Sequence, residues 1–423
     1  MSTIWIDLTT TRALRGRAPV GITRIERALA LAAANNLGER VRFAHFDRYE
    51  RLWLQLDPAR AQRLLTDRQA PRRTGHGAPA RRHGFAASAR EIERRMRPIL
   101  RRVTGPAMRA LGSGDLPAAF APGDRLVLLG DLATMRGIEP LLAHARNRRV
   151  GLIAMVYDLI PWRLPHFFAD RASVLGFCDN LSRLLPHAEA ILVPSRATGS
   201  DLEAFAHDRG LPLPPVAPIA LGRGPVPEGQ PRRPDWAMSL GSDGFALCVG
   251  TVQVRKNHRL LYNVWRRLLE RGTPGMPTLV LAGDVGWLTG DVRALIARDP
   301  LVAGKIVITG PVDDDELAWL YRSCRFTLYP SLYEGWGLPV AESLCAGKTC
   351  ITSSSSSMPE AAAGMTTLVD PYDFARWCDA VRAHVCDVEH LREAERRIDA
   401  GQIRAMWQDA ERRFLDLLAK PAA

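Results

Sequence analysis

Short runs of aliphatic and β-branched residues alternate with helix-length amphipathic runs along most of this chain of 423 residues. Such alternation predicts an α/β fold, in which helices cover the faces of parallel sheets. The strands expected in the first half are 3–8, 41–46, 125–129, 152–156, 190–193 and 216–220. Those expected in the second half are 245–249, 278–282, 305–309, 326–329, 350–353 and 367–369.

The alternation stops once and then restarts, which divides the chain into two halves. Residues 223–236 are rich in proline, glycine and charge, so we expect a linker there. The halves 1–222 and 237–400 each predict a doubly wound, Rossmann-like sheet that binds ligands at the carboxyl ends of its strands. Neither half contains Gly-x-Gly-x-x-Gly, the fingerprint of nicotinamide dinucleotide binding.

The composition is that of a soluble globular protein, with 47% hydrophobic and 24% charged residues. No run of eighteen apolar residues predicts a membrane-spanning helix, and residues 1–8 lack the basic flank and apolar core of a signal peptide. The seven cysteines form no Cys-x-x-Cys pair, which is typical of reduced thiols rather than of disulfides or zinc ligands. These observations predict a cytoplasmic protein.

Most of the net charge of +12 lies in one segment. Residues 51–110 hold fifteen arginines and four acidic residues, and they overlap an insertion expected at about 55–115. One interpretation is a solvated insertion. Another is that residues 60–105 lie on an anionic membrane surface through a basic helix at 88–103, whose Ile92, Met96 and Ile99 share one face. Nucleic acid is a third alternative, disfavoured because no aromatic residues are interleaved with the arginines for stacking.

The most informative stretch is 330–342, Pro-Ser-Leu-Tyr-Glu-Gly-Trp-Gly-Leu-Pro-Val-Ala-Glu. It follows an expected strand and opens a helix near Leu338, with Pro339 in the first turn, where its missing N–H is harmless. Gly335 and Gly337 let the backbone approach a ligand closely. The free N–H groups and the positive end of the helix therefore predict a diphosphate site.

Two carboxylates, Glu334 and Glu342, flank the start of this helix. The two carboxyl groups of a glycosidase would lie about 5–9.5 Å apart. The eight-residue spacing, at a rise of about 1.5 Å per residue, separates these two by about 12 Å. We therefore expect two separate tasks, in which each carboxylate accepts hydrogen bonds from hydroxyls, one set on a sugar and the other on a ribose.

This stretch resembles the Glu-x7-Glu signature of retaining glycosyltransferase family 4, which has the GT-B fold and includes bacterial polysaccharide mannosyl- and rhamnosyltransferases. Residues 249–251 and 255–258 are similar to the family's first phosphate-binding loop, and 279–283, 286–287, 358–360 and 369–371 to its later strands and turns. The resemblance implies two Rossmann-like domains facing across a cleft. Residues 1–222 would bind the acceptor, residues 237–400 the nucleotide sugar, and a helix at 401–423 would return toward the first domain.

The resemblance also implies roles for individual residues of the second half. Lys256, aided by Arg255, would neutralise the departing diphosphate, and a lysine is informative in a chain with 53 arginines and four lysines. Glu334 would bind hydroxyls of the donor sugar, and Glu342 would bind the ribose. The remaining residues of the implied donor site are Gly250, Thr251, Gly335, Trp336, Gly337 and Leu338.

The chain departs from the family pattern at several positions. Thr251 stands where many members carry arginine, and Trp336 replaces the usual phenylalanine. In the first half, Gly21 lies in a stretch similar to the family's N-terminal glycine loop, which implies a place near the diphosphate and the acceptor. Tyr157 precedes Asp158 where the family often has His-Asp, and we expect Asp158 to orient the acceptor hydroxyl.

Two further sets of residues lie near the ends of expected strands. Ser195 and Arg196 resemble a family turn that lines the cleft. Residues 313–315 are three aspartates that could mimic a metal-binding Asp-x-Asp. Because Glu316 and the residues after it follow at helical period, we expect an N-cap and first turn there, and no metal site.

The sequence thus predicts a retaining, metal-independent hexosyltransferase with no cofactor. The resemblance implies that mannose or a deoxyhexose would pass from a nucleotide diphosphate sugar, with GDP favoured, to a glycan or lipid-linked acceptor in surface polysaccharide biosynthesis. Its place would be the cytoplasm, with peripheral contact at the inner face of the plasma membrane. The alternatives are a nucleotide-sugar epimerase or phosphorylase on the same fold, and a non-enzymatic basic binder of membrane or nucleic acid.

Overall fold

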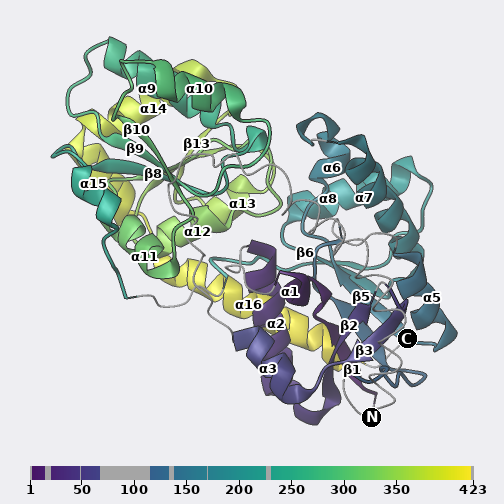
Figure 1. Ribbon diagram of the computed structural model, residues 1–423. Helices are drawn as coiled ribbons and strands as arrows, with labels where there is room; N and C mark the ends of the chain where they lie inside the picture. Colours follow the sequence, from purple (N-terminus) through teal and green to yellow (C-terminus); the bar gives the residue numbers. More distant parts are fainter. Residues whose placement is uncertain are drawn as a thin grey trace, which may run out of the picture. The chain divides into compact units, whose positions relative to one another are not determined.

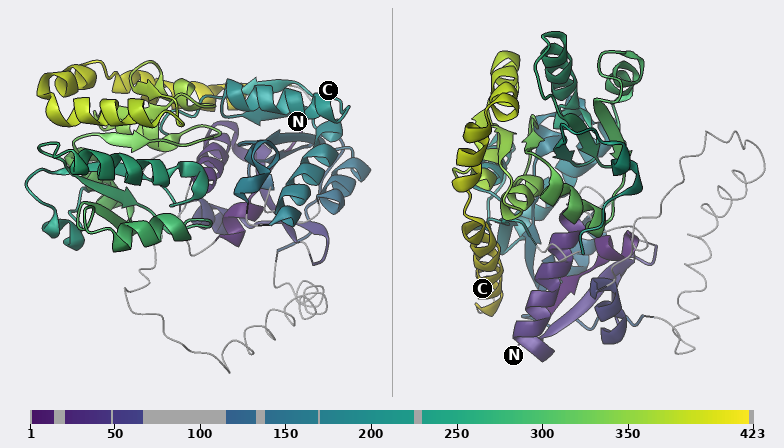
Figure 2. Two further views of the ribbon diagram at one scale, coloured as in Figure 1. Left: turned by 90° about the horizontal axis from the view of Figure 1, so that it is seen from above. Right: turned by 90° about the vertical axis from the view of Figure 1, so that its left-hand side faces the viewer.

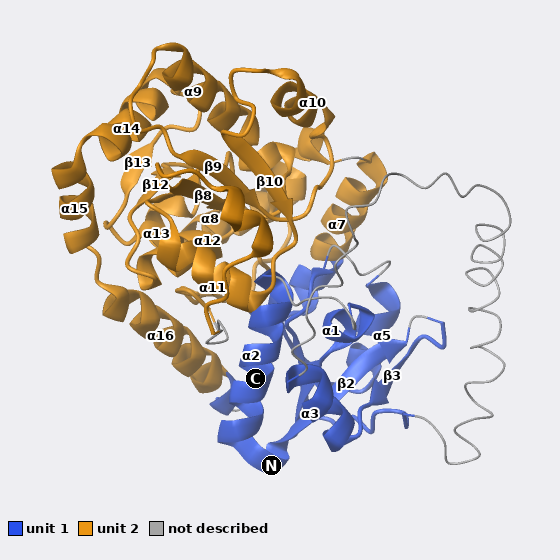
Figure 3. Ribbon diagram, turned by 60° about the vertical axis from the view of Figure 1, so that its left-hand side comes forward, with its two compact units in different colours: residues 1–155, 183–191, 418–423 blue, residues 156–182, 192–417 orange. Residues whose placement is uncertain are grey.

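The computed structural model describes residues 2–14, 21–47, 49–66, 115–132, 138–168, 170–224 and 230–420. The chain forms two compact units, shown in different colours in Figure 3. Unit 1 comprises Met1–Met155, Arg183–Ile191 and Leu418–Ala423, and unit 2 comprises Val156–Ser182 and Leu192–Leu417. Most of the expected basic insertion, including the helix at 88–103, and part of the expected linker lie outside the described residues. The predicted domain boundaries therefore stay predictions.

The first sheet has seven strands in the order β3-β2-β1-β4-β5-β6-β7 (Figure 1). Strands β1, β2, β4 and β5 pair in parallel, whereas β2 and β3 pair antiparallel. The strand bounds are β1 Ile4–Asp7, β2 Val41–Asp47, β3 Leu52–Gln55, β4 Arg125–Leu128, β5 Gly151–Met155, β6 Ala190–Val193 and β7 Val216–Pro218. All of the first-half strands expected from the sequence are present, and β3 is an addition.

Strand β3 was missed because its turn carries no glycine or Asn-Gly signal. The turn is instead closed by Asp47, whose Oδ1 accepts hydrogen bonds from the N–H groups of Tyr49 at 2.9 Å and Glu50 at 3.1 Å. Such a side-chain turn mimics a backbone turn. It returns the chain so that Trp53, which is fully buried, opposes Phe46 in the antiparallel pair.

The second sheet has six parallel strands in the order β10-β9-β8-β11-β12-β13, and helices cover both of its faces (Figure 2). The strand bounds are β8 Phe245–Val249, β9 Thr278–Ala282, β10 Ile306–Gly310, β11 Thr327–Tyr329, β12 Cys350–Ser353 and β13 Thr367–Val369. Each lies within one residue of its expected position. The sequence prediction of Rossmann-like parallel α/β sheets is thus confirmed.

The helices that follow the strands bury an apolar stripe against the sheets. Phe245 and Leu247 of β8 and Val280 of β9, for example, pack with Leu317 and Leu320. In the first half the helices are α1 Thr9–Ala13, α2 Gly21–Leu37, α3 Pro58–Thr66, α5 Glu139–Asn147, α6 Ile160–Arg163, α7 Arg171–Leu184 and α8 Arg196–Asp208. In the second half they are α9 His258–Glu270, α10 Gly290–Arg298, α11 Asp314–Ser323, α12 Leu338–Cys345, α13 Met358–Ala362, α14 Phe374–Cys386, α15 Val388–Arg396 and α16 Ala400–Ala419. Within the described ranges, none of these helices combines the length and apolar character that crossing a bilayer requires.

The strand order of the second sheet determines where its ligand site is expected. From β8 the chain adds β9 and β10 on one side, and then crosses over to add β11, β12 and β13 on the other. Doubly wound sheets bind ligands at such a reversal, beside the carboxyl ends of the two central strands. The loops that follow β8 and β11 are those that carry residues 250–256 and 330–337.

Candidate functional site

Two loops at the carboxyl ends of β8 and β11 form the core of the candidate site. The first runs from Gly250 through the short 3-10 turn η6 (Val254–Lys256) into α9, and the second leads into α12. The backbone joins them, because Leu332 N–H donates to the carbonyl of Arg255 at 2.8 Å. Gly250 has a φ of +137°, which places its α-carbon next to the Lys256 side chain; an added Cβ would lie 3.6 Å from Lys256 Cε. A glycine is therefore favoured there.

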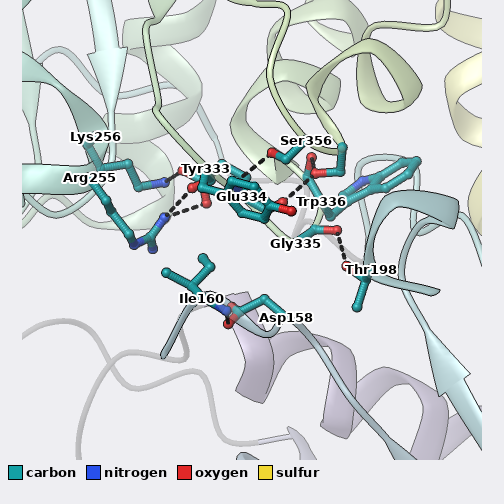
Figure 4. A network of polar contacts seen from close by, with 11 residues as sticks. Asp158, Ile160, Thr198, Arg255, Lys256, Tyr333, Glu334, Gly335, Trp336 and Ser356 are labelled. Atoms are coloured by element: carbon teal, nitrogen blue, oxygen red, sulfur yellow. Dashed lines mark hydrogen bonds and ion pairs between the residues drawn. The ribbon is translucent and has the colours of Figure 1, made fainter. Parts of the chain in front are cut away.

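Glu334 lies between the two predicted cations (Figure 4). Its Oε2 accepts a hydrogen bond from Arg255 Nη1 at 2.6 Å, and its Oε1 forms an ion pair with Lys256 Nζ at 2.5 Å. Burial by itself favours the neutral acid, but the charges of Arg255 and Lys256 outweigh it and hold the pKa of Glu334 at about 2. The three side chains, which we call the Glu334 cluster, thus contain an ionised carboxylate and two cations at neutral pH.

The backbone around Glu334 is held by two serines of the loop before α13. Glu334 N–H donates to Ser356 Oγ at 2.9 Å. Ser357 Oγ donates to the carbonyl of Glu334 at 2.9 Å and to that of Trp336 at 2.7 Å. Nothing in the serine run at 353–357 predicts this role, because a run of one residue type does not show which backbone groups its hydroxyls reach.

The turn into α12 requires glycine at its N-cap. Gly337 has a φ of +120°, and a Cβ added there would lie 3.1 Å from Met358 Sδ. Leu338 opens the helix, as expected, with proline in its first turn. Trp336 is buried, and its indole N–H donates to the carbonyl of Gly222 at 2.8 Å. Phenylalanine could not make this bond, which gives the departure from the family pattern a structural reason.

Glu342 lies inside α12, one face of which is buried. Its Oε2 accepts a hydrogen bond from the hydroxyl of Tyr321 at 2.8 Å. Burial, followed by the charge of Glu342, raises the pKa of Tyr321 well above its ordinary value, so this hydroxyl stays a donor. The implied ribose contact of Glu342 remains a prediction.

Asp158 lies close to the Glu334 cluster within unit 2. A Cβ added to Gly335 would lie 2.0 Å from the carbonyl oxygen of Tyr157 and 2.9 Å from Asp158 Cβ. Burial opposes the charge on Arg255, but Glu334 and Asp158 outweigh this and raise its pKa. Asp158 Oδ1 also accepts a hydrogen bond from Ile160 N–H at 3.1 Å (Figure 4). The structure thus brings together Asp158, Arg255, Lys256, Glu334 and Gly335.

The remaining predicted residues are placed as follows. Thr251 packs in the β8–α9 loop, where its Cγ2 would lie 3.0 Å from a Cβ added to Gly286. Gly21 is the first residue of α2 in unit 1, so its implied nearness to the diphosphate stays a prediction. Ser195 is the N-cap of α8, and its Oγ donates to the carbonyl of Gly335 at 2.8 Å.

The aspartates at 313–315 form a helix start, as expected. Asp313 accepts a hydrogen bond from Glu316 N–H at 2.8 Å, and Glu316 accepts one in return from Asp313 N–H at 3.2 Å. This reciprocal pair is a capping box. Among the residues that the structure describes, no group of three or more His, Cys, Asp or Glu side chains could hold a metal ion.

The second sheet and its site match a known family. Residues 244–387 match the family described as Glycosyl transferases group 1. O-antigen chain mannosyltransferase B of Escherichia coli is 36% identical over 146 residues, which cover 34% of this chain and 37% of that protein. A D-inositol 3-phosphate glycosyltransferase of Xylanimonas cellulosilytica is 27% identical over 239 residues, 53% of each chain. Most of each sequence thus lies outside the region that matches between this chain and the E. coli protein.

Solved structures extend the likeness in fold to the whole chain. Sucrose-phosphate synthase of Thermosynechococcus elongatus superimposes with a TM-score of 0.63 over 99% of this chain and 98% of its own, at 16% identity. HepE of Anabaena, solved with UDP and glucose, gives a TM-score of 0.57 over the same shares, at 13% identity. The fold is that of the GT-B glycosyltransferases, as the sequence predicted. Residues 244–387 of this chain are thus similar to the glycosyl transferases group 1 family.

Proposed function

We propose that this protein transfers a hexose from a nucleotide diphosphate sugar to a hydroxyl of a glycan or lipid-linked glycan, with retention at the anomeric carbon and without a metal ion. The observation that carries the proposal is the Glu334 cluster. An ionised carboxylate and two cations meet at the strand-order reversal of the second sheet, before the N-terminus of α12. They lie inside the segment that the family matches.

The chemistry requires negative charge to be stabilised on the leaving group. The bond between the anomeric carbon and the diphosphate breaks, the acceptor oxygen forms the new bond, and the acceptor proton passes to the departing phosphate. Arg255 and Lys256 are placed to neutralise the charge that develops on the diphosphate, together with the backbone N–H groups at the start of α12. One preorganised donor of this kind can lower the barrier by about 3–4 kcal/mol.

In the structure, both cations are paired with Glu334. A diphosphate must therefore compete with this carboxylate, and binding would release Glu334 toward the hydroxyls of the donor sugar. Asp158, which lies beside Arg255 and Gly335, is suited to orient the acceptor hydroxyl.

The names of the relatives suggest the substrates. O-antigen chain mannosyltransferase B supports mannose as the sugar, and hence GDP-mannose as the first donor to test. An O-antigen is a surface polysaccharide, so the acceptor proposed is a glycan on a lipid carrier. The predicted cytoplasmic location and the contact with the inner face of the plasma membrane form part of this proposal.

The proposal is tested by incubating the purified chain with GDP-mannose, a GDP-deoxyhexose, UDP-glucose and UDP-galactose, each with and without lipid-linked glycan acceptors. We expect nucleotide diphosphate release and a new glycan product only when an acceptor is present. We also expect the product linkage to keep the anomeric configuration of the donor by NMR, and no loss of rate in EDTA. Free epimerised sugar nucleotide without an acceptor would indicate an epimerase. Sugar phosphate formed only with added orthophosphate would indicate a phosphorylase.

A further inference from the structure

We propose that one face of helix α8 is a positioning device for Glu334, through Ser195, Thr198 and Asp201, which we call the α8 clamp. The proposal rests on the proposed transferase function and adds positioning residues to it. The three residues are spaced three apart, so they share a face of the helix. All three are buried, with exposed fractions of 1%, 2% and 4%.

The first two clamp residues hold the chain just after Glu334. Ser195 Oγ donates to the carbonyl of Gly335 at 2.8 Å. Thr198 Oγ1 donates to the same oxygen at 3.2 Å (Figure 4). Gly335 is also in close contact with the carbonyl of Tyr157, and an added Cβ would clash with it at 2.0 Å. The peptide after Glu334 is thus held from two directions.

The third clamp residue holds the chain just before Glu334. The hydroxyl of Tyr333 donates to Asp201 Oδ2 at 2.6 Å, and Arg163 Nε pairs with Asp201 Oδ1 at 3.0 Å. Hydrogen bonds to a charged, buried carboxylate are among the stronger ones in proteins. Both neighbours of Glu334 in sequence are therefore bound to α8, whereas the Glu334 side chain itself contacts Arg255 and Lys256.

The start of α8 is in turn fixed by a carboxylate from the element next to the site. Glu360 of α13 accepts hydrogen bonds from the N–H groups of Arg196 and Ala197, both at 2.9 Å. A carboxylate at a helix N-terminus is stabilising. Because α13 follows the serines that hold Glu334 and Trp336, the clamp and the serine loop form one connected support.

Two substitutions remove clamp contacts while preserving side-chain shape. Tyr333→Phe removes the hydroxyl that Asp201 binds, and Thr198→Val removes the hydroxyl that Gly335 binds but keeps the backbone N–H that Ser195 caps. We expect each to lower kcat about 10-fold or more, since a misplacement of about 1 Å can cost about 100-fold. The dissociation constant for GDP, measured by calorimetry, should stay within about threefold, because the two cations that bind phosphate are unchanged. Thr198→Ser, which keeps the hydroxyl, should retain most of the wild-type kcat.

The chain offers a matched control in Tyr262. Its hydroxyl donates to Asp299 at 2.8 Å, and Asp299 also pairs with Arg266 at 3.1 Å, so the same triad occurs away from the candidate site. Tyr262→Phe should lower the melting temperature as much as Tyr333→Phe does but leave kcat unchanged. Equal kcat values for the two phenylalanine variants, or a loss of kcat in Tyr333→Phe accompanied by an equal loss of GDP binding, would overturn the clamp. If the wild-type chain transfers no sugar from any donor, the proposed function itself is contradicted, and so is the clamp proposal that rests on it.

Discussion

At the scale of single residues, the candidate site is defined by one carboxylate shared between two cations. Glu334 holds both Arg255 and Lys256, and the cluster as a whole keeps one positive charge in excess. Such a pair is costly to break from one side only, because a buried charge is then left uncompensated. A diphosphate can take the place of the Glu334 carboxylate, because it supplies negative charge of its own to the two cations.

This competition leads to a prediction for Glu334→Gln. Removing the negative charge frees both cations, so we expect GDP to bind about 10-fold more tightly, a gain of about 1.4 kcal/mol, while sugar transfer falls about 100-fold. Lys256→Ala should weaken both GDP binding and transfer. Isothermal titration with GDP and initial transfer rates measure the two effects.

The control for this substitution is Glu270→Gln. Glu270 also pairs with two arginines, Arg266 at 3.4 Å and Arg267 at 3.7 Å, but on the exposed side of α9. Glu270→Gln should change neither the affinity for GDP nor the rate of sugar transfer. GDP binding that is unchanged or weaker in Glu334→Gln would show that the carboxylate does not compete with the diphosphate.

At the scale of elements, the end of β1 and the second turn of α2 bury two carboxyl groups in unit 1. Asp7 accepts hydrogen bonds from Thr9, and Glu26 accepts one from Thr11 Oγ1 at 2.9 Å. Both residues are fully buried. Burial raises the pKa of Asp7 to about 6, and burial together with the charge of Asp7 raises that of Glu26 to about 8.

These raised pKa values predict how stability depends on pH. Between the ordinary pKa of glutamate and about 8, the folded state binds more protons than the unfolded state, so the free energy of unfolding falls as pH rises through this window. Glu26→Gln removes the titration, and we expect this variant to be more stable than wild type at pH 9 by on the order of 2 kcal/mol. Urea unfolding at pH 6 and pH 9 measures the difference. Wild-type stability that rises from pH 6 to pH 9 would contradict the prediction.

At the scale of the whole molecule, described residues on the two sides of the arginine-rich segment 67–114 contact one another. Arg60 of α3 pairs with Asp115 at 2.6 Å, and Gln55 N–H donates to the carbonyl of Leu116 at 2.7 Å. Residues shortly before 67–114 thus contact residues directly after it, so a Gly/Ser linker that spans the rest of α3 can join Thr66 to Asp115. None of the residues of the Glu334 cluster or the α8 clamp lies within this segment.

We therefore predict that a chain with residues 67–114 replaced by a short Gly/Ser linker still folds and binds GDP with wild-type affinity. If the segment contacts an anionic membrane surface, as its charge predicts, co-sedimentation with vesicles containing anionic lipid should be lost and that with neutral vesicles unchanged. Vesicles without anionic lipid and the unaltered chain are the controls. Loss of GDP binding in the shortened, folded chain would show that the segment belongs to the nucleotide site.

The sequence by itself determined the local features of this protein. The six strands of the second sheet were predicted within one residue, and the N-cap and first turn at 313–315 were predicted from the helical period that follows them. The turn from Gly335 into α12 was predicted from its glycines and proline. These features depend on residues that are neighbours in the chain, where periodicity, caps and glycine conformations act.

Only the tertiary structure decided which distant residues meet. Arg255 and Glu334 are 79 residues apart and Asp201 and Tyr333 are 132 apart, and they meet because of the order in which strands and helices pack. The resemblance to a family named Arg255, Lys256 and Glu334 separately, but their pairing, the serine support and the α8 clamp were not in the pattern. Hydrophobic periodicity determines which face of an element is buried, whereas the partner of a buried polar side chain depends on the neighbouring elements that bring donors and acceptors within reach.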